Sequence, residues 1–155
     1  MNKLEPIPTI SLNYEGTGYS SKSNELGMRP MQEKAFAKRG EKYLLIKSPP
    51  ASGKSRALMF ITLDKIKNQS IKKAIIVVPE RSIGASFYDT PLSKDGFFTD
   101  WKVLPKWNLC DSPGTEGGKV NSFKAFFESS DYILITTHST FRFAVDKFGI
   151  DIFDN

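Results

Sequence analysis

The residues Ser48 to Ser55, in the order Ser-Pro-Pro-Ala-Ser-Gly-Lys-Ser, have the types needed to bind a phosphate. They follow the apolar run Tyr43 to Ile46 and lead into a segment of helical character, Arg56 to Ile61. A turn with inward-pointing backbone N–H groups, continued by a helix N-terminus, offers donors and a positive partial charge to phosphate oxygens. The order strand, turn and helix therefore predicts a phosphate-binding P-loop.

Within this loop, each residue type has a predicted role. Lys54 is the predicted catalytic residue, because its ammonium would neutralise the β and γ phosphates. The hydroxyl of Ser55 is the predicted Mg²⁺ ligand, and Gly53 lets the backbone approach closely. The predicted cofactor-binding residues of this loop are Ser52, Gly53, Lys54, Ser55 and Arg56. The literal pattern G-x-x-x-x-G-K-[ST] is not met, since serine stands at its first glycine position, so an ordinary strand-to-helix turn is the alternative.

The bulk composition is that of a soluble globular domain. The chain has 155 residues, of which 39% are hydrophobic and 25% charged. Its formal net charge of +5 suits a polyanionic partner, although solvated lysines would give the same surplus. The single cysteine, Cys110, excludes an internal disulfide, and no stretch of about 18 apolar residues exists to span a bilayer. We expect a cytoplasmic protein without a structural zinc site.

The elements that would position the loop alternate between strands and helices. The predicted strands are residues 10–12, 43–46, 74–79, 101–104 and 132–137. Helices are predicted over residues 30–39, after Lys54, and over residues 82–87 and 139–148. A further helix is predicted to be capped by Asn121 or Ser122 and to end at Phe127. Residues 89–100 and 111–118 are predicted loops. Residues 1–28, rich in proline, glycine and serine, are predicted to form an extended arm before a domain over residues 29–155.

Continuously apolar strands separated by helices predict an α/β fold with a mainly parallel sheet covered by helices on both faces. In such sheets ligands bind beyond the carboxyl ends of the strands. We therefore expect the P-loop, residues 79–82 and residues 136–140 to lie along one edge of the sheet.

Four stretches, in order, resemble the first motor domain of superfamily 2 helicases and translocases, most closely the branch with type III restriction-enzyme motor subunits. They are Arg29-Pro30-Met31-Gln32, Ser48 to Ser55, Val77 to Ser82 and Ile133 to His138. The resemblance implies a RecA-like P-loop domain, a three-layer sandwich, that binds ATP and Mg²⁺. It also implies that Gln32, with Arg29 beside it, recognises adenine. The residues it places along a nucleic-acid backbone, expected to be DNA, are Arg81, Ser82, Thr136, Thr137 and Ser139.

Two departures from the family pattern bear on activity. Pro50 and Ala51 stand where the family has threonine and glycine, and a proline removes a donor N–H from the loop. The acidic motif II that holds Mg²⁺ and activates water is absent up to Asn155. We therefore expect the chain to be the N-terminal part of a longer motor protein, binding nucleotide but hydrolysing it very poorly alone.

Two other interpretations remain open from the sequence. A different P-loop enzyme, such as a small-molecule kinase, would explain the loop but not the upstream Arg-Pro-Met-Gln. A nucleic-acid-binding module with a degenerate loop would explain the departures at Pro50 and Ala51.

Overall fold

A computed structural model describes residues 9–11, 23–111 and 115–153 of the chain. The chain divides into two compact units, which we describe separately. Unit 1 comprises residues 1–69 and 91–100, and unit 2 comprises residues 70–90 and 101–155. Among the described residues, no helix is long and apolar enough to cross a membrane.

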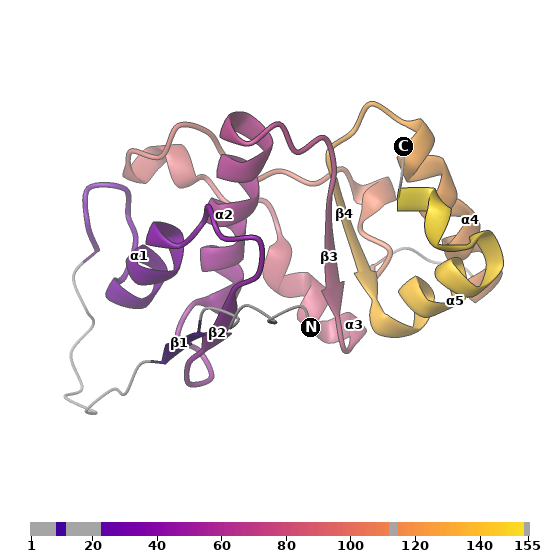
Figure 1. Cartoon of the computed structure of the whole chain (residues 1–155), viewed down its shortest axis with the longest axis horizontal. Coiled ribbons are helices and arrows are strands. Elements are labelled where there is room, and N and C mark those ends of the chain that lie inside the picture. The colour runs from indigo at the N-terminus through magenta and orange to yellow at the C-terminus, as the bar shows by residue number, and fades with distance from the viewer. Residues whose placement is uncertain (1–8, 12–22, 112–114, 154–155) are drawn as a thin grey trace, which may run out of the picture. The chain divides into compact units, whose positions relative to one another are not determined.

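Unit 1 is built on a short parallel strand pair and two helices (Figure 1). Strand β1 (Thr9–Ser11) pairs in parallel with β2 (Leu45–Lys47), and Ile10 lies opposite Ile46. Helix α1 (Pro30–Ala37) packs against α2 (Lys54–Asn68). The buried contact is formed by Met31, Ala35, Ala57 and Ile61. Three of these side chains are small or unbranched, so the two helices approach closely through their apolar faces.

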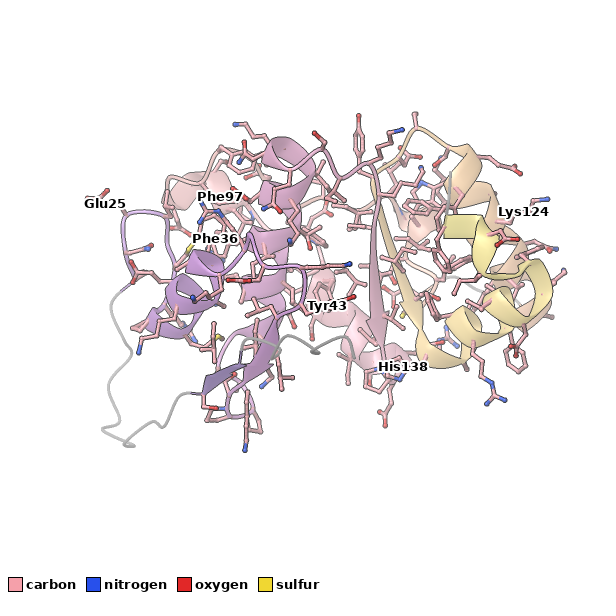
Figure 2. All side chains as sticks on the ribbon, in the orientation of Figure 1. Glu25, Phe36, Tyr43, Phe97, Lys124 and His138 are labelled. Carbon is pink, nitrogen blue, oxygen red and sulfur yellow. The ribbon has the colours of Figure 1, made fainter. Side chains whose placement is uncertain are left out.

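Residues 91–100 belong to unit 1 although they follow part of unit 2 in sequence. A 3₁₀ helix over Leu92–Asp95 lies within the segment predicted to be a loop, and Leu92 is completely buried. The ring of Phe97 meets Phe60 at 4.8 Å and Phe36 at 6.0 Å between centroids, edge to face in both cases. Phe36 and Phe97 are labelled in Figure 2. Aromatic pairs favour this geometry, so the segment is fixed to unit 1 by its rings.

Unit 2 is built on a longer parallel pair, β3 (Ala74–Val78) and β4 (Ile133–Thr137). Every residue of β4 is buried, as expected of an apolar strand covered on both faces. Helix α3 (Arg81–Gly84) follows β3, and α5 (His138–Phe148) follows β4 and packs against α4 (Glu116–Glu128) (Figure 1). The buried core comprises Trp107, Leu109, Val120, Phe123, Phe126, Leu134 and Ala144.

A polar network around Lys73 and Asp131, the residues just before β3 and β4, links the starts of these strands to the end of α4. The ammonium of Lys73 donates to the carbonyl oxygens of Phe126, Ser129 and Asp131 at 2.7–2.9 Å. Two of these carbonyls close the C-terminal end of α4, where a cation is favourable. Burial lowers the pKa of Lys73 against the opposing effect of Asp131. The Asp131 carboxylate accepts from Trp107 Nε1 at 2.6 Å and pairs with Lys106 at 3.1 Å.

The α/β class predicted from the sequence is confirmed, and both strand pairs are parallel. Two predicted elements are wrong. Residues 101–104 form no strand, since Trp101 makes only one antiparallel bridge, to Thr90, while its indole N–H donates to the Phe87 carbonyl. Helix α4 begins before Asn121, because the Thr115 side chain caps it by accepting from Gly118 N. The arm boundary at residue 28 and the three-layer sandwich stay predictions.

Candidate nucleotide-binding site

The turn between β2 and α2 has the predicted strand, turn and helix order. Two of its residues adopt left-handed backbone conformations, Ala51 with φ 58° and Gly53 with φ 88°. Helix α2 begins at Lys54, directly after Gly53. A side chain at position 53 would suit neither this backbone nor its surroundings, because a Cβ there would collide with Gln32 Nε2. Glycine at this position therefore serves both the turn and the approach of α1.

Lys54 is folded onto the turn that precedes it. Its ammonium donates to the carbonyl oxygens of Ser48 at 3.0 Å and Pro49 at 2.7 Å. The hydroxyls of Ser48 and Ser52 are hydrogen-bonded to each other at 2.7 Å. These contacts give the turn a closed shape with the ammonium beside its backbone. A phosphate bound within the turn would lie next to this charge, which is the arrangement that neutralises a terminal phosphate.

Gln32 connects the start of α1 to this turn. It is 1% exposed, its Oε1 accepts from Arg29 N at 2.9 Å and its Nε2 donates to Gly53 O at 3.0 Å. Each end of the carboxamide therefore holds one backbone group, and each retains one further hydrogen-bonding position. The predicted adenine residue is also the residue that ties α1 to the phosphate-binding turn.

A polar cavity of about 330 Å³ opens beside Gln32 and Gly53. The charged residues lining it are Arg29, Arg56 and Asp95. Arg56 Nη2 and Asp95 Oδ2 are 2.6 Å apart. Of the predicted cofactor-binding residues, Arg29, Gln32, Gly53 and Arg56 line this cavity, whereas Ser52, Lys54 and Ser55 are not among its lining residues. Asp95 was missed, and no motif in the sequence marks it, because residues 91–100 reach this cavity only through tertiary packing.

The residues predicted to contact nucleic acid lie at one edge of the β3–β4 sheet. The pairing of Val78 with Thr137 brings the carboxyl ends of both strands to the same level. Ser82 and Ser139, just beyond these ends, are exposed. Arg81 is also exposed, and its Nε donates to Cys110 O at 2.7 Å. Polar groups of two strand ends therefore form a common edge in unit 2.

Two threonines of this set do not present their hydroxyls at the surface. Thr137 caps α5 by accepting from Thr140 N at 3.3 Å, and its hydroxyl bonds Ser139 at 3.1 Å. Thr136 is fully buried, and among the described residues its hydroxyl has no hydrogen-bond partner. The exposed positions of this edge are thus Arg81, Ser82 and Ser139. The strand before the turn, β2, pairs with β1, whereas this edge belongs to the β3–β4 sheet. The turn and the edge thus lie on two separate two-stranded sheets and not, as the sequence predicted, along one sheet.

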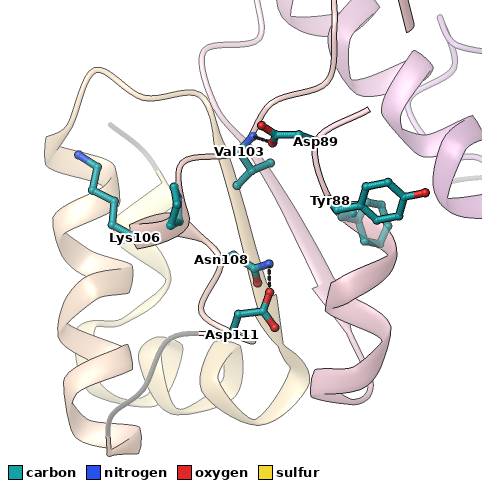
Figure 3. Close-up of a pocket in the computed structure, with 8 residues that line it drawn as sticks. Tyr88, Asp89, Val103, Lys106, Asn108 and Asp111 are labelled. Atoms are coloured by element: carbon teal, nitrogen blue, oxygen red, sulfur yellow. Dashed lines mark hydrogen bonds between the residues drawn. The ribbon is translucent and has the colours of Figure 1, made fainter. Parts of the chain in front are cut away.

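Unit 2 also contains a cavity of about 460 Å³ next to residues 108–111 (Figure 3). Asn108 Nδ2 donates to Asp111 at 2.8 Å, and Asp89 accepts from Val103 N at 3.1 Å. Nearby Cys110 is buried, and this burial, with the Asp111 charge, raises the pKa of its thiol. The thiol is thus held protonated, as in a packing residue.

A metal ion has few possible ligands near the turn. Among the residues that the structure describes, no group of three His, Cys, Asp or Glu side chains converges to hold one. The hydroxyl of Ser55 suits Mg²⁺, which commonly keeps several waters and takes its other ligands from phosphates and one or two carboxylates. The residues present thus fit one protein ligand to a nucleotide-bound Mg²⁺.

The chain is 58% identical over 146 residues to a protein of Bacillus subtilis (strain 168) named "Putative ATP-dependent helicase YeeB". The two chains are homologous over this length. The match covers 94% of this chain, and the chain spans 24% of the length of that relative. No protein-family profile matches the chain, and no solved structure matches it.

Proposed function

We propose that this chain is the nucleotide-binding part of an ATP-dependent helicase or translocase. The observation that carries the proposal is the turn between β2 and α2, with Lys54 folded onto it and Gln32 joining it to α1. The relative named as an ATP-dependent helicase supports the same function, since it matches nearly the whole chain.

The proposed site binds ATP through three groups of unit 1. The turn's backbone and the Lys54 ammonium hold the terminal phosphates, replacing the carbonyl contacts that Lys54 now makes. Gln32 offers its remaining donor and acceptor positions to adenine. Ser55 holds Mg²⁺, which would neutralise charge between the phosphates when bound.

The proposed nucleic-acid surface is the strand-end edge of unit 2. Arg81, Ser82 and Ser139 offer one guanidinium and two hydroxyls to backbone phosphates. Binding of this kind is independent of base sequence and weakens steeply with salt. We place Thr136 and Thr137 beneath these residues, since burial and helix capping keep their hydroxyls off the surface.

The proposal extends beyond the described residues in two respects. Hydrolysis requires an acidic strand end that positions Mg²⁺ and water, together with a second motor domain. The greater length of the relative is compatible with such parts in the whole protein. The finer assignment to a restriction-type motor acting on DNA depends on the motif resemblance alone.

The test is the affinity for an ATP analogue in the presence of Mg²⁺. We expect Lys54→Ala to weaken binding about 10- to 100-fold, because hydrogen bonds to charged groups contribute about 1.5–3 kcal/mol each. Lys34→Ala, which removes an exposed lysine of α1, is the matched control and should leave the affinity unchanged.

An unchanged affinity in Lys54→Ala would reject the nucleotide site and favour a nucleic-acid-binding module with a degenerate loop. A kinase would bind ATP in the same way, so a second assay separates it. ATP hydrolysis by the whole protein should rise on addition of nucleic acid, and Arg81→Ala should reduce that stimulation.

A further inference from the structure

Asp95 reaches the cavity beside the turn from a segment distant in sequence. It lies 39 residues after its partner Arg56, within the segment 91–100 that joins unit 1. Leu92 and Phe97, on either side of it, are buried in unit 1. The carboxylate is therefore held at the cavity by two apolar anchors rather than by its ion pair alone.

Two glycines, Gly27 and Gly96, allow the close backbone contact that positions Asp95. Gly27 and Gly96 have φ of 71° and 93°, in the left-handed region. A Cβ on Gly27 would collide with the Asp95 side chain, and one on Gly96 would lie 2.6 Å from the Glu25 carbonyl oxygen. The turn at residues 24–27 and the segment 91–100 thus interlock at close range. This close contact fixes the position of Asp95 relative to Arg29 and Gln32, which follow that turn in the sequence.

The carboxylate of Asp95 is only partly used within the protein. Its Oδ2 pairs with Arg56, while among the described residues its Oδ1 makes no hydrogen bond, and the side chain is 49% exposed. A carboxylate is an acceptor only, so a ligand group that bonds the free oxygen must be a donor. Phosphates and the ring nitrogens of adenine are acceptors and would be repelled. In ATP the available donors are the ribose hydroxyls and the adenine amine.

The lining of the cavity favours the ribose. Lys54 and Ser55 are placed at the phosphates and Gln32 at the base, on the proposed function. Arg56, which holds Asp95, is the next residue of α2 after Ser55, and the pair lines the same cavity as Gly53 of the turn and Gln32. The ribose joins phosphate to base in the nucleotide itself. A cavity of about 330 Å³ is at the lower end of ligand-sized pockets, which suits a nucleoside without its phosphates.

Arg56 also explains how a carboxylate is tolerated near a triphosphate. With Arg29 it gives two positive charges against the one negative charge of Asp95, which leaves the cavity with a net charge of +1. The ion pair at 2.6 Å orients the carboxylate as well as offsetting its charge.

We infer that Asp95 accepts hydrogen bonds from the ribose hydroxyls of the bound nucleotide and so favours nucleotides that carry these hydroxyls over their 2′,3′-dideoxy forms. The inference rests on the proposed function, because it requires the phosphates to occupy the turn.

The experiment measures the affinities of the intact chain for four competitors of a fluorescent ATP analogue, with Mg²⁺ present. They are ATP, 2′,3′-dideoxy-ATP without either hydroxyl, inosine triphosphate without the amine, and inorganic triphosphate. We expect ATP to bind at least about tenfold more tightly than dideoxy-ATP, since a hydrogen bond to a charged group is worth this factor. Asp95→Asn should reduce that ratio to about twofold or less and leave inorganic triphosphate within about twofold. Glu33→Gln, which removes an exposed carboxylate of α1 outside the cavity, should keep the wild-type ratio.

Each other outcome overturns a specific statement. If the wild-type chain binds ATP and dideoxy-ATP equally while Lys54→Ala abolishes both, the nucleotide site stands and the ribose contact is wrong. If Asp95→Asn alters the preference for ATP over inosine triphosphate instead, the carboxylate contacts the base amine and the ribose contact is again wrong. If neither ATP nor inorganic triphosphate binds, the proposed function itself fails. The wild-type ratio decides the matter even if Asp95→Asn folds poorly.

Discussion

The two strand pairs of this chain are both parallel but differ in how they are supported. Strands β1 and β2 have three residues each, and Leu45 of β2 is 54% exposed. Strands β3 and β4 have five residues each, and all of β4 is buried. The polar cavity and the left-handed turn follow the short, open pair. In this molecule the candidate nucleotide site is on the unit with the short strand pair, and the larger aromatic core belongs to unit 2.

This difference predicts that the largest loss of stability comes from the core of unit 2. Phe123 is completely buried, and its ring contacts those of Phe127, Phe141 and Phe153. Phe123→Ala should lower the free energy of unfolding by about 3–5 kcal/mol, through lost burial and the cavity left behind. The measurement is chemical denaturation. Phe143→Ala, at a ring that is 52% exposed, should change stability by less than about 1 kcal/mol.

Hydrogen exchange of the same variants sharpens the comparison. Amides of β4 should lose most of their protection in Phe123→Ala, because local stability follows buried contacts. Equal protection of β2 and β4 in the wild-type chain would contradict the difference between the two units.

A smaller effect is expected at the turn of unit 1. Gly53→Ala places a side chain in the left-handed region and against Gln32 Nε2. We expect the free energy of unfolding to fall by about 1–3 kcal/mol and ATP-analogue binding to be lost. Gly40→Ala is the control, since a Cβ at Gly40 meets nothing within 4 Å and its φ is not in the left-handed region. Retained nucleotide binding in Gly53→Ala would show that the turn does not need this conformation.

The polar network of unit 2 predicts a pH dependence. The hydrogen bond from Trp107, then that from Lys106, lowers the pKa of Asp131 against partial desolvation. Its contribution is complete above the unfolded-state pKa of about 3.9 and is lost as the pH falls through the lower folded-state value. Asp131→Asn should therefore be less stable than wild type at pH 7, with a difference that shrinks below about pH 4.

Urea denaturation at pH 7 and pH 3 measures this difference. Asp151→Asn, at an exposed position of unit 2, serves as the control for a simple change of charge. A difference between Asp131→Asn and wild type that grows in acid would contradict the assigned direction of the pKa shift.

The smallest effect concerns the backbone strain at Ala51. The left-handed conformation costs a non-glycine residue about 1–2 kcal/mol, while glycine loses about 0.4–1 kcal/mol more entropy on folding. Ala51→Gly should therefore raise stability by about 1 kcal/mol or less and strengthen phosphate binding. Ser70→Gly, at the other described non-glycine residue with positive φ, gives the same relief outside the turn and should leave binding unchanged.

The sequence predicted those elements whose apolar residues form a regular local pattern. The runs at β3 and β4 and the helices α1, α2 and α5 were recognised because their apolar residues are consecutive or recur at helical spacing. The start of α4 was missed, since Gly117 and Gly118 are poor helix formers and the Thr115 cap outweighs them. Residues 101–104, three of which are apolar, resembled a strand. The Trp101 indole N–H instead donates to the Phe87 carbonyl, a long-range contact that the spacing of apolar residues does not predict.

The candidate site was predictable only where its residues are adjacent in sequence. The turn from Ser48 to Ser55 was identified from residue types at fixed spacing, and Gln32 from a short upstream motif. Asp95 depends on the docking of Leu92 and Phe97, two isolated apolar residues in a segment without a regular pattern. Long-range packing of this kind leaves no local signal in the sequence.

The path of the chain between the units limits how the protein can be dissected. The polypeptide leaves unit 1 at residue 69, re-enters it at 91 and departs again at 100, so no single cut separates the two units. A truncation ending near residue 69 would strip Phe60 of its aromatic neighbour Phe97 and leave Arg56 without its counter-ion. An expression fragment meant to isolate the candidate nucleotide site should instead join residues 91–100 to the first 69 residues through a short designed linker.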